Sequence, residues 1–130
     1  MEITVNIKTS IEEAIRIVNE DSNFILYSES SIVGEKRFGY IYFIYCFVKE
    51  KEGEIVYIGK SKGHLLKERL KNHFQKKHPK TGSKLAIIQN EIAKGNKLKL
   101  KLLKVTPESF RNTLEEELIS HFRPLWNVQK

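Results

Sequence analysis

The chain has 130 residues, a size typical of a single domain with a hydrophobic core, and its hydrophobic fraction of 40% excludes a disordered chain. No apolar stretch approaches the ~20 residues that a helix needs to cross a bilayer. The formal net charge of +7 favours a polyanionic partner, nucleic acid before a membrane, because contacts with phosphates release condensed counterions. A lysine-rich soluble surface would have the same charge, so charge alone does not decide between the two.

The N-terminal residues have neither the basic segment nor the long apolar segment of a signal peptide. The single cysteine, Cys46, lies inside an apolar run and cannot form an internal disulfide. We therefore expect a cytoplasmic protein.

Residues 1–7 place apolar side chains at alternate positions, which predicts a short strand. Thr9 or Ser10 then begins a helix, because each stands three residues before a glutamate in the pattern of a capping box. Apolar residues follow at helical spacing, so one face of this helix packs on the core: Ile11, Ala14, Ile15 and Val18. Residues 24–27 are expected to be extended and 28–36 to form a loop. No candidate chemistry lies in this part of the chain.

Residues 40–48 are all apolar or aromatic, as expected for a strand that is buried on both faces. A charged turn separates them from a second strand at 54–59, so the two strands form a β-hairpin, and a basic segment follows at 60–64.

The register of this hairpin decides whether two tyrosines meet. A hairpin tip at 49–50 places Tyr42 directly opposite Tyr57, whereas a tip centred on Lys51 places them on opposite faces. A tip at 52–53, which turn chemistry favours, leaves them on one face but roughly 20 Å apart, at about 3.4 Å per residue. The residues of the hairpin leave all three registers open.

The second half of the chain alternates helices with one strand. Helices are expected at 65–78 and 84–94, with a break at 79–82 and Gly95 as the C-terminal glycine of the second helix. Residues 97–102 alternate lysine and leucine, which indicates a strand whose leucines face the core and whose lysines face water or a phosphate backbone. A last helix begins at Thr106 to Ser109, with Pro107 at its first position, and runs to about Phe122.

This order of elements predicts an α+β fold, a small three-stranded and mostly antiparallel sheet flanked by helices. We expect a single domain over residues 1–130, in which a β/α extension at 1–38 packs on the remaining core.

Two side chains on the helix at 65–78 depart from the pattern of a core-facing helix. At about 100° per residue, His73 falls inside the apolar arc, and Arg69 falls on its shoulder one turn earlier. Either residue alone fits a structural role, with the Arg69 guanidinium reaching solvent and His73 hydrogen-bonded in the core. As a pair that follows a basic segment, they fit a phosphate site better.

The same arithmetic separates three consecutive glutamates on the last helix. Glu115 falls within the apolar arc, whereas Glu116 points away and Glu117 lies on the opposite edge. A partly buried carboxylate needs a partner such as a metal ion or an arginine, so Glu115 is the candidate functional carboxylate. Glu116 and Glu117 are expected on a solvated face.

Taken together, these residues resemble the GIY-YIG nuclease family. The family's two name motifs correspond to Tyr40-Ile41-Tyr42, with tyrosine in place of the first glycine, and to Tyr57-Ile58-Gly59. Arg69 and His73 fall where the family carries an arginine and, in several branches, a histidine one turn later. Residues 114–119 are similar to the helix with the metal-binding glutamate, and 123–127 to the closing segment that ends in asparagine. The resemblance covers residues 39–127 and implies the register in which the two tyrosines face each other.

The resemblance implies divalent-metal-dependent hydrolysis of phosphodiester bonds in DNA, with Glu115 as the one protein ligand to Mg²⁺ or Mn²⁺. Arg69 would neutralise the scissile phosphate. Tyr42 or Tyr57 would position or deprotonate the attacking water, which requires that the metal and the arginine lower a tyrosine pKa of about 10. The other implied roles are a proton shuttle, an orienting amide and a phosphate contact: His73, Asn127 and Lys60.

The closing segment and the Arg-x-x-x-His pair are similar to the restriction-enzyme branch, which implies a defence or mobile-element nuclease acting on double-stranded DNA as a homodimer. One alternative is a basic module, derived from a nuclease fold, that binds nucleic acid through its lysines without cutting it. Another is a histidine metalloprotein, but the four histidines lack paired ligand spacing: His64, His73, His78 and His121.

Overall fold

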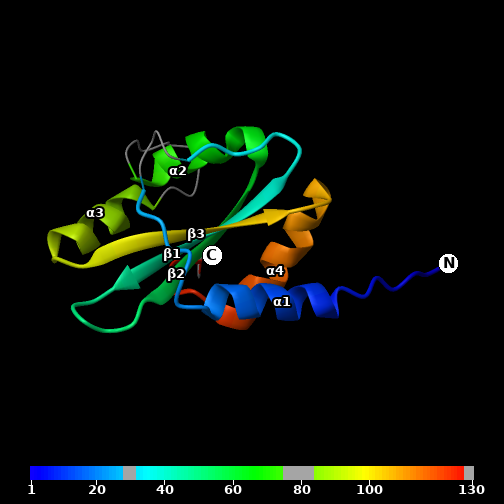
Figure 1. The fold of residues 1–130 in the computed structure, drawn as a ribbon, viewed down its shortest axis with the longest axis horizontal. Coiled ribbons are helices and arrows are strands. Elements are labelled where there is room, and N and C mark those ends of the chain that lie inside the picture. The colour runs from blue at the N-terminus through cyan, green and yellow to red at the C-terminus, as the bar shows by residue number, and fades with distance from the viewer. Residues whose placement is uncertain (28–31, 75–83, 128–130) are drawn as a thin grey trace.

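The structure, a computed structural model, describes residues 1–27, 32–74 and 84–127. Its centre is an antiparallel three-stranded sheet in the order β2-β1-β3, with helices on both faces (Figure 1). The predicted α+β fold is confirmed. The elements are α1 Lys8–Asn19, β1 Gly39–Phe47, β2 Glu54–Lys62, α2 Leu66–Phe74, α3 Leu85–Ala93, β3 Lys97–Val105 and α4 Arg111–Phe122. No helix in the described ranges is both long and apolar enough to cross a membrane.

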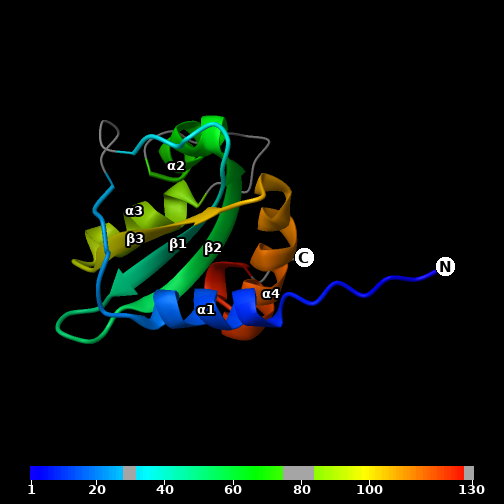
Figure 2. The same cartoon turned by 45° about the vertical axis from the view of Figure 1, so that its right-hand side comes forward.

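The central strand β1 is buried on both faces, as its unbroken apolar run predicts. Alternate side chains enter two separate cores, because successive residues of a strand point to opposite faces. The core under α2 and α3 takes Tyr40, Tyr42, Ile44 and Cys46, and the core under α1 and α4 takes Ile41, Phe43 and Tyr45. Figure 2 shows the two helix pairs on either side of the sheet.

The hairpin register implied by the resemblance is wrong by two residues. Tyr42 pairs with Gly59, and Ile44 pairs with Tyr57, so the two tyrosines are diagonal neighbours on one face. Beyond this point the register shifts, because Val56 is an extra residue opposite β1 and forms a β-bulge. On one side of the bulge the strands pair in the register that brings the two tyrosines together, and on the other side the register differs and leads into the hairpin loop.

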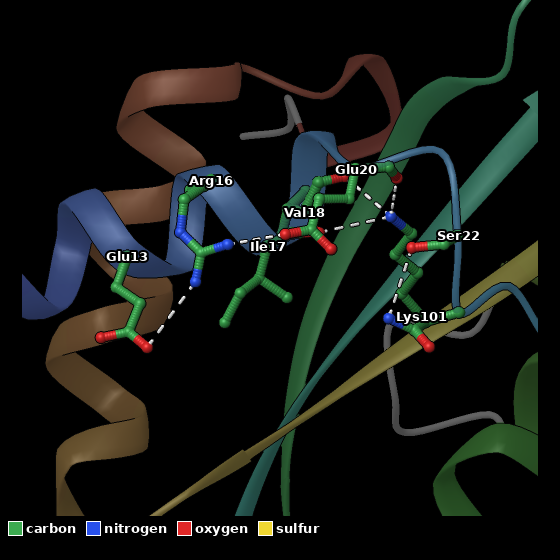
Figure 3. Close-up of polar contacts among 8 residues, drawn as sticks. Glu13, Arg16, Ile17, Val18, Glu20, Ser22 and Lys101 are labelled. Carbon is green, nitrogen blue, oxygen red and sulfur yellow. Dashed lines mark hydrogen bonds and ion pairs between the residues drawn. The ribbon is translucent and has the colours of Figure 1, made fainter.

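The basic segment that follows the hairpin belongs partly to the sheet, because β2 continues to Lys62 and buries Ser61. The lysines of β3 also depart from the expected solvent-facing row. Lys101 is only 4% exposed, and its ammonium donates to the carbonyls of Val18 (3.1 Å), Ile17 (3.4 Å) and Glu20 at the end of α1 (Figure 3). The prediction is wrong for Lys101, because α1 covers the face that the lysines share.

The strand predicted over residues 1–7 is absent from the structure. Ile3 and Val5 are exposed, and this segment extends away from the sheet, where no described strand pairs with it (Figures 1 and 2). Helix α1 begins at Lys8, so Thr9 and Ser10 lie inside it, and the side chain that bonds its first N–H is that of Asn6, whose Oδ1 accepts from Lys8 at 3.0 Å. The expected packing of α1 is confirmed, since its apolar face buries Ala14 and Val18 in the core shared with α4.

The remaining boundaries differ from the predictions in detail. Residues 24–27 contribute one bridge, in which Ile25 and Leu100 exchange two hydrogen bonds of 2.8 Å. Gly95 has a φ of +90°, as expected after a helix. Pro107 precedes a 3₁₀ turn at Glu108–Phe110, and α4 proper begins only at Arg111. The expected helix end at 75–78, the break at 79–82 and part of the loop at 28–36 lie outside the described residues.

Candidate active site

Three aromatic rings from three different elements meet on the face of the sheet covered by α2. The ring centroids of Tyr42 and Tyr57 lie 6.2 Å apart, and His73 of α2 lies 5.7 Å from the first and 5.2 Å from the second. His73 is 5% exposed, which agrees with its predicted place inside the apolar arc of the helix. The structure therefore brings together two strands and a helix around one pair of hydroxyl groups.

Gly59 makes this arrangement possible because it leaves space for the Tyr42 ring. The two residues are direct partners across the β1–β2 ladder. A Cβ atom added at Gly59 would lie 2.3 Å from Cζ and 2.4 Å from Oη of Tyr42, far inside van der Waals contact. The glycine of the Tyr-Ile-Gly motif is therefore required sterically, because the hydroxyl end of the Tyr42 ring lies over its backbone.

His73 uses both ring nitrogens inside the protein. Its Nε2 atom lies 3.0 Å from the hydroxyl of Tyr42, and its Nδ1 atom accepts a hydrogen bond of 3.0 Å from the backbone N–H of Lys84. Burial lowers the pKa of His73 to about 4, and the positive charges of Lys84 and Arg69 act in the same direction. A neutral histidine with two internal partners is better suited to orienting Tyr42 than to exchanging protons with solvent.

The two tyrosines differ in burial. Tyr42 is 1% exposed, and its pKa is raised by burial first and by Tyr57 second. Tyr57 is half-buried, and its pKa is raised by burial first and by the charge of Glu115 second. Arg69 and a hydrogen bond with Tyr42 lower the Tyr57 pKa. Tyr57 is therefore the hydroxyl that a substrate or a water molecule reaches more easily.

A carboxylate and an ammonium group lie at the edge of the sheet formed by β2, and the charge of the carboxylate acts on both tyrosines. Glu115 projects from α4, and its carboxylate lies 3.5 Å from the ammonium of Lys60 on β2. The Glu115 side chain is 13% exposed; burial raises its pKa, while Lys60 opposes this shift. Glu116 and Glu117 are exposed, as the helical arithmetic predicts.

Arg69 lies one turn before His73 on α2, and its side chain is exposed, in agreement with its predicted place on the shoulder of the helix. Its positive charge lowers the pKa values of Tyr42, Tyr57 and Glu115. The guanidinium is thus an accessible cation in the same electrostatic environment as the tyrosines and the carboxylate.

Asn127 reaches the site indirectly. Its side-chain oxygen accepts from the backbone N–H of Ile58 at 2.7 Å, and its amide nitrogen donates to the Ile58 carbonyl at 2.8 Å. Because β2 is an edge strand, the Asn127 amide takes the place of a neighbouring strand at this residue. It fixes the backbone between Tyr57 and Gly59, which is an orienting role exerted through β2.

Lys84 is a member of the site that its position in the sequence did not reveal. Its ammonium lies 5.5 Å from the centre of the Tyr57 ring, and its amide bonds to His73. Nothing in the local pattern around Lys84 marks it, because its partners belong to β2 and α2. Only the way α3 packs beside α2 brings it to the rings.

The oxygen donors of this site fit a hard divalent cation that takes one protein ligand. Among the described residues, no three His, Cys, Asp or Glu side chains lie together as a metal-binding group. Mg²⁺ commonly keeps several waters and binds one or two carboxylates plus phosphate oxygens, so the single carboxylate of Glu115 is sufficient. The histidine alternative finds no support here, since His64 and His121 are exposed and His78 lies outside the described residues.

Residues 38–129 match the GIY-YIG catalytic domain. No curated protein and no solved structure matches the chain significantly. The family match spans every residue of the tyrosine, histidine, arginine and glutamate arrangement described above, and it covers well over half of the chain. The chain therefore belongs to the GIY-YIG catalytic domain family and is a nuclease.

Proposed function

We propose that this nuclease is a divalent-metal-dependent endonuclease that hydrolyses phosphodiester bonds in double-stranded DNA. The observation that carries the proposal is the convergence of the tyrosine pair, Arg69 and Glu115 at the edge strand β2. Each group supplies something that hydrolysis of a phosphodiester needs: a site for the attacking water, a positive charge for the phosphate and a carboxylate for a cation.

In this proposal, water attacks the phosphorus and releases a proton to solvent, the bond to the leaving oxygen breaks, and that oxygen takes up a proton from solvent. Tyr57 orients the water through its half-buried hydroxyl, and Tyr42 supports Tyr57 from inside the core. Arg69 binds the phosphate oxygens, where negative charge increases in the transition state. Bound by Glu115, Mg²⁺ or Mn²⁺ would supply a Lewis acid for a phosphate oxygen.

Lys60 completes the phosphate contacts. In the protein alone its ammonium neutralises Glu115, at 3.5 Å. Glu115 would hold the cation in place of Lys60, and the Lys60 ammonium would then be available to the phosphate backbone. The partly buried Glu115 carboxylate would therefore have a positively charged partner with or without the cation.

The biological role proposed is cleavage of foreign DNA, as in restriction or another defence or mobile-element system. Two sites related by a two-fold axis can cut both strands in one binding event, so a homodimer is the proposed active form. The net charge of +7 supports a nucleic-acid substrate.

The lysines of β3 give little support to the alternative, a module that binds nucleic acid without cleaving it. Lys101 donates to carbonyl groups of α1, and Lys104 pairs with Glu35. The β3 lysines therefore do not present the unbroken cationic row that such a module would need.

Supercoiled plasmid tests the proposed function directly. Wild type with Mg²⁺ is expected to nick or linearise it, and EDTA is expected to stop the reaction. Arg69→Ala and Glu115→Ala are each expected to reduce the rate by about 10²-fold or more. Glu117→Ala is the matched control, because it removes an exposed charge from the same helix. Cleavage by Glu115→Ala at the rate of wild type would refute the assignment of the site.

A further inference from the structure

We infer that Lys84 is a positioning residue of this site, which holds His73 as the neutral tautomer with its proton on Nε2 and so fixes the direction of the hydrogen bond to Tyr42. The catalytic consequence rests on the proposed function, whereas the tautomer itself is a property of the protein alone. Three observations carry the inference: an amide contact, the packing that fixes this amide, and the position of an ammonium group.

The amide contact determines where the imidazole proton lies. The backbone N–H of Lys84 points at Nδ1 of His73 with a length of 3.0 Å. A backbone N–H can only donate, so Nδ1 accepts, and the single proton of the neutral ring is on Nε2. Nε2 lies 3.0 Å from the Tyr42 hydroxyl, and it therefore donates to the Tyr42 oxygen.

The position of this amide is fixed by α3 rather than by the lysine side chain. The Lys84 carbonyl accepts from the N–H of Ile88 at 2.9 Å, which begins the first turn of α3. Ile88 is fully buried in the core under α2, so the docking of α3 sets the orientation of the peptide group at residue 84. Substitutions of the Lys84 side chain leave this amide in place.

The Lys84 side chain adds a positive charge beside the rings. Its ammonium lies 5.5 Å from the centroid of Tyr57, at a distance typical of a cation–π contact. The groups that face His73 are Tyr42 from β1, Tyr57 from β2, Lys84 before α3 and Arg69 on its own helix. The two charged groups among them are positive, so they disfavour a second proton on the imidazole.

The consequence is a hydrogen-bond chain with a fixed direction. Since Tyr42 accepts from His73, its own hydroxyl hydrogen is available to donate towards Tyr57, whose ring centroid lies 6.2 Å from that of Tyr42. The opposite tautomer, or a doubly protonated ring, would place two donors face to face at the Lys84 amide. Lys84 thus determines which way the tyrosine pair is polarised.

Nitrogen NMR of the full-length protein, uniformly ¹⁵N-labelled and free of metal, tests the tautomer, because imidazole ¹⁵N shifts separate protonated from unprotonated nitrogens. At neutral pH we expect the His73 signals, assigned with His73→Gln, to show a proton on Nε2 and none on Nδ1. Lys84→Met should keep this tautomer and raise the titration midpoint of His73 by about one pH unit, a shift typical of one neighbouring charge.

Two further variants complete the experiment. Lys84→Arg keeps the charge and should retain the low midpoint, and Lys51→Met, which removes an exposed lysine of the hairpin loop, should leave it unchanged. A proton on Nδ1 in wild type, or a midpoint that does not move in Lys84→Met, would overturn the inference.

Steady-state cleavage kinetics test the consequence for the reaction. Because the Lys84 amide and the His73 tautomer persist in Lys84→Met, the effect on cleavage comes from the missing ammonium beside the Tyr57 ring: we expect kcat to fall about 10-fold, KM to stay within about twofold of wild type, and kcat to recover in Lys84→Arg. A rise in KM at unchanged kcat would mean that Lys84 is a phosphate contact and would overturn the inference. If wild type cuts no DNA but the NMR results hold, the tautomer assignment stands and the proposed function fails.

Discussion

The Tyr42 ring lies directly over the backbone of Gly59, its partner across the β1–β2 ladder, so that a Cβ atom at position 59 would lie 2.3 Å from the ring. This contact connects the two name motifs of the family physically. Tyr57 stands two residues before Gly59 on the same face, and this spacing places both tyrosine rings next to His73.

Gly59→Ala is expected to displace the Tyr42 ring and to destabilise the protein by about 1–3 kcal/mol, the usual cost of overpacking a core. Cleavage should fall by more than the loss of folded protein explains. Chemical denaturation followed by plasmid cleavage at a temperature where the variant is folded measures both effects. Gly95→Ala is the control, since its cost of about 1 kcal/mol comes from its φ of +90° alone and it lies far from the site. Equal activity losses in both variants would contradict this account.

Substitution of the two tyrosines should affect kcat and the unfolding free energy to different degrees. Tyr57→Phe removes a half-buried hydroxyl and is expected to lower kcat about 10²-fold or more with little change in unfolding free energy. Tyr42→Phe leaves the Nε2–H of His73 without its partner and should also cost about 1–3 kcal/mol of stability. Tyr45→Phe removes a buried hydroxyl that donates to Val18 on the other face, so it should cost stability without lowering kcat. Full activity in Tyr57→Phe would exclude Tyr57 as the residue that orients the water.

The unfolding free energy should depend on pH through His73. The pKa of His73 is lowered to about 4 in the folded protein, against about 6.5 in an unfolded chain. Between these values the unfolded state binds more protons, so stability falls as pH decreases from about 6.5 to 4, by up to about 3 kcal/mol. Urea denaturation of wild type and His73→Gln at a series of pH values measures this, and the variant should lose most of the slope in that window. An equal slope in both proteins would show that His73 is not the group responsible.

Asn127→Ala should loosen β2 at the site by removing two hydrogen bonds to Ile58. We expect a loss of about 1–3 kcal/mol in unfolding free energy and faster hydrogen exchange at Tyr57 and Gly59, together with a lower kcat. Asn127→Asp should not rescue these properties, because a carboxylate cannot donate to the Ile58 carbonyl. An unchanged exchange rate at Gly59 in Asn127→Ala would contradict the role of the Asn127 amide in holding β2.

Lys101→Met should destabilise the attachment of α1 without affecting the chemistry. The substitution leaves the carbonyl groups at the end of α1 without their charged donor, which typically costs about 1.5–3 kcal/mol. Thermal unfolding should show the loss, while kcat per folded molecule stays at the wild-type value. Lys97→Met, an exposed position on the same strand, is the control. A large fall in DNA binding in Lys101→Met, with stability unchanged, would restore the phosphate-facing interpretation of this lysine.

Local periodicity identified the residues that a single helix positions. The burial of His73, the exposure of Arg69 and the inward direction of Glu115 follow from 100° per residue, because a helix fixes the angular position of each side chain without reference to the rest of the fold. The apolar run of β1 likewise indicated a central strand that is buried on both faces.

Contacts between elements were decided by the tertiary structure. The register that places Gly59 under Tyr42 depends on the bulge at Val56, and a bulge has no signature in an alternating sequence. Lys101 is buried because α1 covers its face of the sheet, and residues 1–7 form no strand because none of the described strands pairs with them. Lys84 meets His73 only because α3 packs beside α2.

The sequence by itself therefore determined the family, the order of elements from β1 onwards and the placement of most candidate site residues on their helices, because these depend on spacing along the chain. Only the tertiary structure decided which hydroxyl is accessible, which nitrogen of His73 bears the proton and which lysine joins the rings. Those properties depend on burial and on hydrogen-bond partners supplied by distant segments, and spacing along the chain carries no information about either.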